Sequence, residues 1–354
     1  MNTKVNNPVL SFMEDMEHEQ VVFCHDKATG LKAIIAVHNT NLGPALGGTR
    51  MWSYSNENEA INDVLRLSRG MSYKAAISGL SLGGGKAVII GDSKTQKTDA
   101  MMEKFGEFVD RLAGSYITAE DVGMTTHDMK MVHKATKHVT GIPIEMGGSG
   151  DPSPVTAYGV YMGMKASAKF KWGSDSLKGK KIMVQGIGHV GESLVSHLTK
   201  EGAEVMINDI FMDRLLEVSK QYGATIVEGD AVYDQEMDIY APCALGATVN
   251  SETLKRLSCE IIAGAANNQL ADEDIHGQEV KDRGIVYAPD FLINAGGLIN
   301  VYSEIKGWTR EKALTKTEEI YNTTLDILNR AEKENLTTHN AAKRIAEERI
   351  ENGF

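Results

Sequence analysis

The segment "KKIMVQGIGHVGESLVSHLTKEGAEVMIND", residues 180–209, carries the pattern that decides the fold of this chain. An apolar run leads into a turn with glycines at Gly186, Gly188 and Gly191, an amphipathic stretch follows, and a second apolar run ends at Asp209. Glycines at this spacing permit a tight turn between strand and helix and let a pyrophosphate approach the first N–H groups of the helix. The segment therefore predicts a strand–helix–strand unit that binds a dinucleotide, in preference to a purely structural glycine-rich turn.

The acidic residue at the end of the second run bears on which dinucleotide is bound. Asp209 stands 23 residues after Gly186, where a carboxylate can accept hydrogen bonds from both hydroxyls of an adenine ribose and would repel a 2′-phosphate. The pattern favours NAD over NADP, although Arg214, five residues further on, could soften that preference. His189 and Val190 complete the cofactor-binding loop, and we interpret the histidine as a tolerated loop residue rather than a ligand.

Strands and helices alternate regularly through the second half of the chain, which predicts an α/β domain with a doubly wound parallel sheet of the Rossmann type. Its further strands are expected at residues 224–229, 237–243, 260–266 and 284–290. The first part of the chain also mixes strands and helices. Its strands are expected at residues 20–26, 30–39, 86–91 and 115–121, and its helices at 57–71 and 98–114. A cluster of Gly, Pro and Ser at 141–156 is the candidate boundary or hinge.

The composition limits the classes of partner. The 354 residues suffice for two domains, and the formal net charge of −11 at pH 7 argues against nucleic acid as a partner. Neither an export signal nor an apolar run of about 18 residues occurs, so no membrane segment is expected. The cysteines are odd in number and lack CxxC spacing, which is typical of reduced packing residues in a cytoplasmic protein. No metal is expected, because the histidines at 127, 133 and 138 fit no usual zinc spacing.

A second glycine-rich motif, "GLSLGGGKAVIIGD" at residues 79–92, is not a P-loop. Leu80 stands where the first glycine of such a loop belongs, and Ala87 follows the lysine instead of Ser or Thr. We interpret Lys86 as lying on a loop whose glycines let a ligand approach the backbone, just before a buried strand.

A nicotinamide enzyme needs a substrate anchor and an acid–base group, and the first domain offers Lys74, Lys86 and Asp121. Burial and a second cation both lower the pKa of a lysine, which is how a lysine becomes a base near neutral pH. From the residues alone, the prediction stops at a nicotinamide oxidoreductase with a lysine-lined cleft.

A series of further motifs resembles the leucine, valine and phenylalanine dehydrogenases of the glutamate dehydrogenase superfamily, and leucine dehydrogenases most closely. The resemblance runs in order from about residue 10 to the C-terminus. Besides the two motifs above it rests on "GPALGGTRMW" (43–52), "MSYKAA" (71–76), "YITAEDVGMTTHDM" (116–129), "GDPSPVTAYGV" (150–160), "AGAANNQL" (263–270) and "DFLINAGGLINV" (290–301).

This resemblance implies an architecture. Residues 1–145, joined by the C-terminal helix 334–354, would form a substrate-binding and oligomerisation domain, and residues 146–333 the NAD-binding domain. An active-site cleft would lie between the two and close by hinge motion near 141–156. The family also implies a homo-oligomer.

The resemblance likewise implies roles for single residues. Lys74 would bind the substrate carboxylate, Lys86 would be the catalytic lysine that assists water attack on an imine, and Asp121 would exchange protons with the amino group. Residues near the nicotinamide and its ribose would be Thr156, Asn267 and Asn294, with Asn267 also near the substrate.

The family's side-chain pocket maps to apolar residues, together with the adjacent glycines: Leu46, Gly47, Gly48, Ala119, Leu298 and Val301. Glutamate dehydrogenases carry a lysine where Leu46 stands, so an acidic substrate would lack a counter-charge here. Leu298 stands where leucine dehydrogenases commonly have valine, and the extra methylene could shift preference toward valine or isoleucine. The expected reaction is NAD-dependent, reversible oxidative deamination of leucine, isoleucine and valine. The alternatives are a phenylalanine or broad-range amino acid dehydrogenase and a non-catalytic NAD or metabolite sensor.

Overall fold

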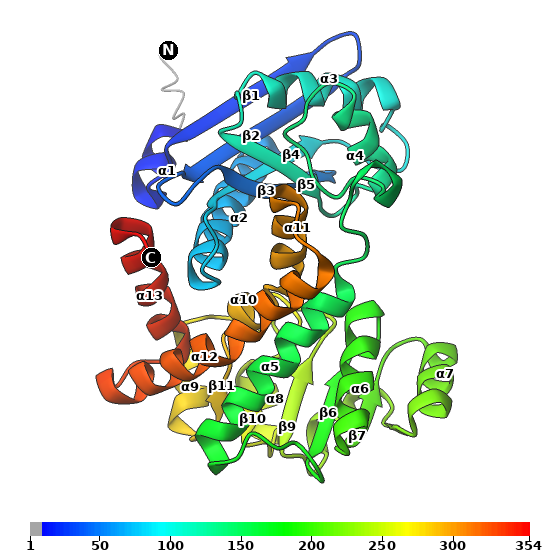
Figure 1. The fold of residues 1–354 in the computed structure, drawn as a ribbon, viewed down its shortest axis with the longest axis vertical. Helices are drawn as coiled ribbons and strands as arrows, with labels where there is room; N and C mark the ends of the chain where they lie inside the picture. Colours follow the sequence, from blue (N-terminus) through cyan, green and yellow to red (C-terminus); the bar gives the residue numbers. More distant parts are fainter. Residues whose placement is uncertain (1–8) are drawn as a thin grey trace, which may run out of the picture. The chain divides into compact units, whose positions relative to one another are not determined.

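The computed structural model describes residues 9–354, which divide into two compact units (Figure 1). Unit 1 contains the chain up to Gly150 together with Ala346–Phe354, and unit 2 contains Asp151–Ile345. The change of unit at Gly150 falls inside the Gly, Pro and Ser cluster that the sequence marks as a boundary. None of the helices in the described residues is long and apolar enough to cross a membrane.

Unit 1 is built on a five-stranded mixed sheet in the order β1-β2-β4-β3-β5. Strands β1, β2 and β4 pair antiparallel, whereas β3 pairs parallel with both β4 and β5. The elements of this unit are α1 (Val9–Met16), β1 (Gln20–Asp26), β2 (Leu31–Asn39), β3 (Ala45–Trp52), α2 (Glu57–Ile77), β4 (Gly83–Ile90), α3 (Asp99–Asp110), β5 (Tyr116–Glu120), α4 (Thr126–His133) and the short 3-10 helix η1 (Ile144–Met146).

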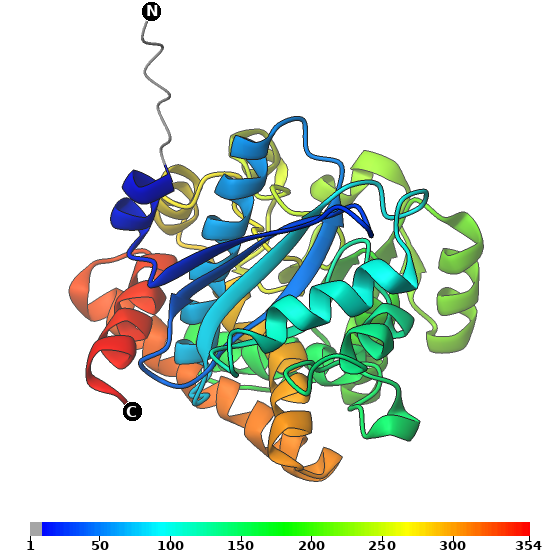
Figure 2. The same ribbon diagram turned by 90° about the horizontal axis from the view of Figure 1, so that it is seen from above.

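Helices cover both faces of this sheet (Figure 2). On one face, apolar residues of α2 pack on β2 and β4 through Ala60, Ile61, Val64 and Leu65. On the other face, α3 and α4 contribute Met101, Phe105, Val109, Met129 and Val132 to a larger core. Apolar residues at helical spacing on α2 and α3 account for this burial.

Strand β4 corrects the interpretation of the second glycine motif. The three glycines and Lys86 lie on the strand itself, Gly83–Ile90, and not on a loop before it. A Cβ on Gly84 would be 2.1 Å from the backbone nitrogen of Ser72 on α2, and one on Gly85 would be 2.6 Å from the ring of Tyr116. The protein's own atoms therefore occupy the space beside these glycines, which serve close packing of strand against helix and ring.

Unit 2 has a six-stranded, wholly parallel sheet in the order β11-β10-β9-β6-β7-β8. Numbered along the chain within the unit, this is the 3-2-1-4-5-6 order of dinucleotide-binding folds read from its other edge, so the predicted doubly wound sheet is confirmed. Its strands are β6 (Lys181–Gln185), β7 (Glu204–Asn208), β8 (Thr225–Ile226), β9 (Ile239–Pro242), β10 (Ile261–Ile262) and β11 (Val286–Tyr287).

The helices of unit 2 lie between and around these strands, and the order of the chain reverses between β6 and β9. They are α5 (Ser153–Trp172), α6 (His189–Glu201), α7 (Met212–Tyr222), η2 (Gly229–Asp234), α8 (Ser251–Arg256), α9 (Ile275–Asp282), α10 (Asp290–Ile293), α11 (Gly296–Lys306) and α12 (Arg310–Glu334). Ligands of such sheets bind beyond the carboxyl ends of the strands at the point of reversal.

The last helix, α13 (Thr338–Asn352), belongs to both units. Near its start His339 lies 2.9 Å from Glu273, and near its end Arg349 donates hydrogen bonds to the carbonyls of Ala76 and Ile77. The second half of α13, from Ala346, therefore belongs to unit 1, and its first half makes its contacts within unit 2. The assignment of residues 334–354 to the substrate-binding domain stays a prediction.

Candidate active site and cofactor site

The side chain of Lys86 projects from the face of β4 that packs on α2. Alternate residues of a strand point to the same face, and Gly84 and Val88 both meet α2. Lys86 is consequently buried, with 6% of the residue exposed. A lysine at such depth needs a partner of opposite charge.

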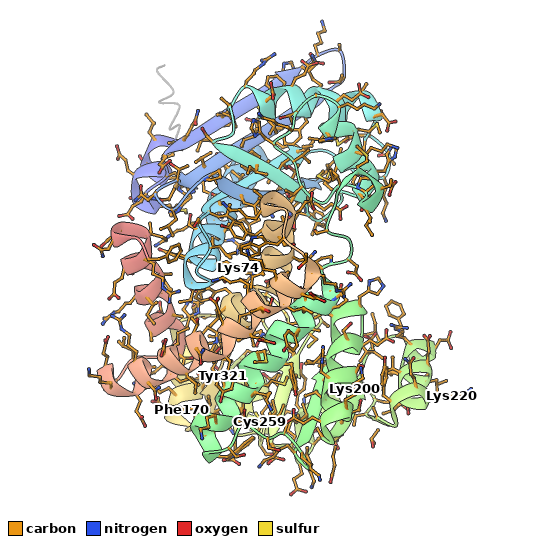
Figure 3. All side chains as sticks on the ribbon, viewed as in Figure 1. Lys74, Phe170, Lys200, Lys220, Cys259 and Tyr321 are labelled. Carbon is orange, nitrogen blue, oxygen red and sulfur yellow. The ribbon has the colours of Figure 1, made fainter. Side chains whose placement is uncertain are left out.

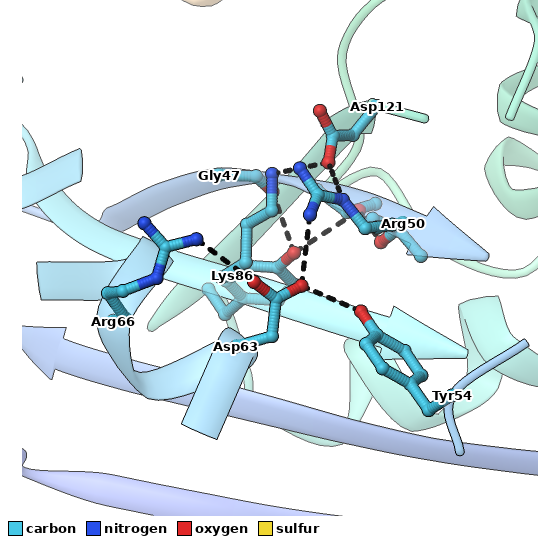
Figure 4. A network of polar contacts seen from close by, with 10 residues as sticks. Gly47, Arg50, Tyr54, Asp63, Arg66, Lys86 and Asp121 are labelled. Carbon is cyan, nitrogen blue, oxygen red and sulfur yellow. Dashed lines mark hydrogen bonds and ion pairs between the residues drawn. The ribbon is translucent and has the colours of Figure 1, made fainter. Parts of the chain in front are cut away.

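That partner is Asp121, which follows β5 directly. Nζ of Lys86 lies 2.7 Å from Oδ2 of Asp121, and Nε of Arg50 donates to the same oxygen at 2.9 Å (Figure 4). Within residues 9–354, Oδ1 of Asp121 has no hydrogen-bond partner. One oxygen thus holds the two cations, and the other can accept a proton or a hydrogen bond from a ligand.

The electrostatics of the pair suit acid–base chemistry. Burial lowers the pKa of Lys86 and the nearby charge of Arg50 lowers it further, which together outweigh the attraction of Asp121. Burial alone would raise the pKa of Asp121, but the charges and hydrogen bonds of Lys86 and Arg50 outweigh it and the pKa is lowered. Lys86 therefore releases its proton more readily than a free lysine does, beside a carboxylate that stays ionised.

Three further residues of this network were not predicted from the sequence: Arg50, Tyr54 and Asp63. Nη1 of Arg50 donates to Oδ2 of Asp63 on α2 at 2.9 Å, and the hydroxyl of Tyr54 donates to the same oxygen at 2.8 Å. Arg50 lies within the motif at 43–52 that carries the family resemblance, so its position was available as a signal. No comparable signal marks Asp63, which stands among other polar residues of a helix.

The predicted substrate anchor, Lys74, lies on the last turn of α2 (Figure 3). It is half-buried and stands two residues after Ser72, the residue that meets Gly84 of β4. Helix and strand are therefore packed together near both lysines. The binding of a carboxylate by Lys74 stays a prediction.

Glycines of β3 shape the surroundings of Asp121. A Cβ on Gly48 would lie 2.9 Å from the Cβ of Asp121, so only glycine permits this approach, and the carbonyl of Gly47 accepts a hydrogen bond from Tyr116 at 2.7 Å. Leu46 is buried, and Ala119 is half-buried opposite Gly48 in the sheet. The part of the predicted side-chain pocket that belongs to unit 1 is thus apolar.

In unit 2, the three glycines of the cofactor motif meet different surroundings. Gly186 has φ +96°, and a Cβ there would lie 2.5 Å from the Cβ of Ala244; one on Gly191 would lie 2.0 Å from the carbonyl oxygen of Gly186. A Cβ on Gly188, the N-cap of α6, would meet nothing within 4 Å. Two glycines are therefore required by the fold, and the third leaves open space at the helix N-terminus, where a pyrophosphate fits.

Next in the motif, His189 begins α6 with 80% of its side chain exposed, and Val190 is half-buried. The predicted contact of each of these two residues with the cofactor stays a prediction.

Asp209 closes the cofactor loop at the end of β7. Its Oδ2 accepts a hydrogen bond from the backbone N–H of Ile187 at 2.8 Å, and its Oδ1 accepts one from Phe211 at 3.1 Å. Asn208, Asp209 and Met212 help to line a hollow of about 460 Å³ beyond the carboxyl ends of β6 and β7. Its place at the strand ends matches the expected site of an adenosine.

Arg214 is already neutralised by two carboxylates. Its guanidinium pairs with Glu192 of α6 and lies 2.7 Å from Glu217, and Nε donates to the carbonyl of Ile187. An arginine held in this way is a weak partner for the 2′-phosphate of NADP.

Asn267 and Asn294 lie together in unit 2. Nδ2 of Asn294 donates to Oδ1 of Asn267 at 2.8 Å and to the carbonyl of Ala265 at 3.1 Å. Oδ1 of Asn294 is buried and has no hydrogen-bond partner among residues 9–354. A buried amide oxygen without a donor fits a carboxamide such as that of nicotinamide.

The other predicted residues of unit 2 lie on α5 and α11. The hydroxyl of Thr156 donates to the carbonyl of Pro152 at 3.0 Å, and a Cβ on Gly297 would lie 3.0 Å from Oγ1 of Thr156. Leu298 is buried and Val301 half-buried on α11. The start of α11 therefore lies directly against the start of α5.

In the part of the chain that the structure describes, the cysteines show no sign of a reactive thiol, and the acidic side chains form no metal site. Cys24, Cys243 and Cys259 are free thiols, and burial raises the pKa of each. No group of three or more His, Cys, Asp or Glu within residues 9–354 is arranged to hold a metal ion.

Known proteins similar to this chain agree with the geometry. Residues 18–138 match the family described as the Glu/Leu/Phe/Val dehydrogenase dimerisation domain, and residues 147–210 and 207–353 match Glutamate/Leucine/Phenylalanine/Valine dehydrogenase. The leucine dehydrogenase of Thermoactinomyces intermedius is 53% identical over 97% of this chain and 93% of its own. The leucine dehydrogenase of Bacillus subtilis is 54% identical over 97% and 94%.

A solved structure shows the same fold at high similarity. The L-tryptophan dehydrogenase from Nostoc punctiforme has a TM-score of 0.88 and 46% identity, covering 98% of this chain and 99% of that one. The resemblance found in the sequence is thus confirmed. The chain belongs to the Glutamate/Leucine/Phenylalanine/Valine dehydrogenase family, whose members are NAD(P)-dependent amino acid dehydrogenases.

Proposed function

We propose that this protein catalyses the NAD-dependent, reversible oxidative deamination of leucine, isoleucine and valine to 2-oxo acids and ammonia. The observation that carries the proposal is the pair of buried Lys86 and Asp121, in which Oδ1 of the carboxylate has no hydrogen-bond partner among residues 9–354. A non-catalytic sensor would have no use for an acid–base pair whose lysine has a lowered pKa. The identity of more than half of the residues to two leucine dehydrogenases supports the choice of substrate class.

When bound, NAD would supply the hydride acceptor for the substrate α-carbon, and the residues of this chain would act on the imine that results. Lys86, in its neutral form, takes a proton from the water that attacks this imine. Asp121, which is ionised before the substrate binds, would take a proton from the substrate's ammonium group before the imine forms. It would return this proton to the amino group as the carbinolamine collapses to a 2-oxo acid and ammonia, with the hydroxyl proton passing to solvent. Lys74 would hold the substrate carboxylate as its counter-charge. Arg50 keeps Asp121 ionised, and so able to accept that proton, until the substrate binds.

The preference for NAD rests on Asp209 and Arg214. Asp209 lies at the end of β7, where its carboxylate would exchange the backbone hydrogen bonds that it accepts now for ribose hydroxyls. Arg214 is compensated by Glu192 and Glu217, so it offers no free charge to a 2′-phosphate. The remaining residues that we assign to the cofactor are Thr156, Gly186, Gly188, His189, Val190, Gly191, Asn267 and Asn294.

The preference for aliphatic substrates rests on the residues assigned to the side-chain pocket. Leu46, Ala119, Leu298 and Val301 carry no charge, and Leu46 is buried. Burying a carboxylate against them without a partner would cost several kcal/mol, which disfavours glutamate. A phenylalanine or broad-range dehydrogenase is the alternative within the family. We also propose a homo-oligomer, in keeping with the dimerisation domain that residues 18–138 match, and retain the prediction of a cytoplasmic location.

Formation of NADH, followed by its absorbance, tests the proposal with leucine, isoleucine, valine, phenylalanine and glutamate, and with NAD or NADP. We expect NAD-dependent turnover of the three aliphatic substrates and none of glutamate. Lys86→Ala should abolish turnover while NADH still binds unit 2, and Lys94→Ala, an exposed lysine on the loop after β4, is the matched control. A wild-type protein that binds NADH and turns over none of these amino acids would refute the proposal in favour of a sensor.

A further inference from the structure

Asp63 is a carboxylate that lies behind the candidate catalytic pair without touching Lys86. Its side chain is 16% exposed and is held by three donors. Arg50 and Tyr54 both donate to Oδ2, and Arg66 of the same helix lies 3.2 Å from Oδ1 (Figure 4). A carboxylate with this many donors on a well-packed helix has a fixed position.

Arg50 connects this carboxylate to the catalytic one. Its guanidinium uses Nε for Asp121 and Nη1 for Asp63, at 2.9 Å in each case. The guanidinium is a rigid planar fork, so holding one end restricts the other. The place of Oδ2 of Asp121, and with it the contact to Lys86, therefore depends on Asp63.

The charges of Arg50 and Asp63 also make the contact between Asp121 and Lys86 depend on Asp63. Arg50 brings a positive charge close to Lys86, and Asp63 offsets part of it from the opposite side of the guanidinium. Were Asp63 neutral, Asp121 would be the only carboxylate that Arg50 contacts among the described residues. Arg50 would then compete with Lys86 more strongly for Asp121.

We propose that Asp63 is a positioning residue for the deamination, acting through Arg50 to hold Asp121 in contact with Lys86. This inference rests on the proposed function, because it assigns Asp63 to the same reaction. Asp63 contacts neither of the two reacting groups directly. Its removal should therefore lower kcat and leave the KM for the amino acid nearly unchanged.

The first test compares Asp63→Asn with Glu57→Gln, which removes the same charge from an exposed position on the same helix. We expect kcat of Asp63→Asn to fall about 10- to 100-fold, the size of effect that misplacement of a catalytic group produces. Glu57→Gln should match the wild type. Asp63→Glu keeps the charge and should recover part of the loss, which a merely structural role would not require.

The pH profile gives a readout that is independent of stability. Within unit 1, the charged groups that act on Lys86 are Asp121 after β5, Arg50 from β3 and Asp63 from α2, the helix that also carries Lys74. Loss of Asp63's charge removes a contribution that raises the pKa of Lys86. The acid limb of kcat/KM in Asp63→Asn should therefore move to lower pH, and that of Glu57→Gln should not.

A double-mutant cycle separates the inference from the proposed function. Arg50→Lys replaces the fork with a single ammonium group, so it should reproduce the loss in kcat, and adding Asp63→Asn to it should cause little further loss. Additive losses, or an Asp63→Asn enzyme with wild-type kcat and pH profile, would overturn the role of Asp63 while leaving the proposed function intact. If Asp63→Asn folds poorly, Asp63→Glu takes its place in the cycle, because Arg50→Lys and Asp63→Glu retain charge at both positions. An inactive wild type would instead mean that the proposed function has failed.

Discussion

Single glycines in β4 decide how closely the rest of unit 1 approaches the catalytic lysine. Gly84 leaves room for the backbone of Ser72, and Gly85 leaves room for the ring of Tyr116. Both lie immediately before Lys86, one on each face of the strand. The absence of a side chain at Gly84 therefore sets the distance between α2 and the strand that carries the lysine, and the absence of one at Gly85 lets Tyr116 pack on the other face.

The cost of adding one methyl group at this point can be measured directly. Gly84→Ala would place a Cβ 2.1 Å from the Ser72 nitrogen, so α2 must move away from β4. We expect a loss of roughly 1 to 3 kcal/mol in the free energy of unfolding, as for overpacked cores, together with a fall in kcat.

The matched control is Gly70→Ala on α2, where a Cβ meets nothing within 4 Å. Because alanine is the better helix former, this variant should gain about 0.5 to 1 kcal/mol. Urea denaturation of both variants and the wild type measures these changes in the free energy of unfolding. Equal stability of Gly84→Ala and the wild type would mean that helix and strand can separate at little cost.

The sequence allowed only part of the site to be predicted at this scale. Lys86 and Asp121 stand out because charged residues are unusual in glycine-rich, apolar surroundings. The glycines before Lys86 were interpreted wrongly as space for a ligand, because the atoms that fill this space come from Ser72 and Tyr116, which pairing and packing bring there. Asp63 could not be predicted for the same reason.

At the scale of elements, the connection from β5 to α4 determines where Asp121 lies. Nζ of Lys97 donates to the carbonyl of Gly123 at 2.7 Å and to Oδ2 of Asp128 at 2.6 Å. The same oxygen of Asp128 accepts hydrogen bonds from the backbone and hydroxyl of Thr125, the N-cap of α4. Hydrogen bonds at Gly123 and at Thr125 therefore hold the turn that follows Asp121 in place.

Asp128→Asn should loosen this connection. It removes the charge that compensates Lys97, and it weakens the capping box of α4, so we expect a loss of about 3 kcal/mol in the free energy of unfolding. Asp99→Asn, in the exposed first turn of α3, should lose less than about 1 kcal/mol. Thermal and urea unfolding distinguish the two. If both variants lost the same small amount, the bond to Lys97 would contribute no more than a surface ion pair.

The spacing of apolar residues predicted that a helix exists better than it predicted the residue at which the helix ends. The pattern at 57–71 predicts α2 but stops short of Ile77, because the small residues Ser72, Ala75 and Ala76 give little periodic signal although all are buried. Lys74 consequently lies on this helix.

At the scale of the whole molecule, the two sheets differ in how far sequence could predict them. Unit 2 alternates strand and helix, and right-handed crossovers then leave few possible orders. Unit 1 has the order β1-β2-β4-β3-β5 with both parallel and antiparallel pairs. Such an order depends on which distant strands pair, and no local pattern in the sequence fixes it.

The stability of unit 1 also includes a buried pair of histidines that joins α1, β2 and α2. The ring centroids of His18 and His38 are 4.8 Å apart, and the rings contact the hydroxyls of Ser68 and Ser72. Burial lowers the pKa of each histidine to about 4, and the charge of Arg69 acts in the same direction. Both are therefore neutral in the folded protein at neutral pH.

This pair predicts that the protein loses stability as the pH falls below about 6.5. The unfolded chain binds protons at that pH and the folded chain only near pH 4, so protonation favours unfolding between the two values. We expect roughly 1 to 2 kcal/mol per histidine to be lost between pH 7.5 and 5. The double variant His18→Gln/His38→Gln should be less stable at pH 7.5 but show a flatter dependence on pH, measured by urea unfolding at each pH. His197 of unit 2, whose pKa burial also lowers, is present in both proteins and cancels in the comparison. An equally steep dependence in the double variant would show that other groups cause the acid sensitivity.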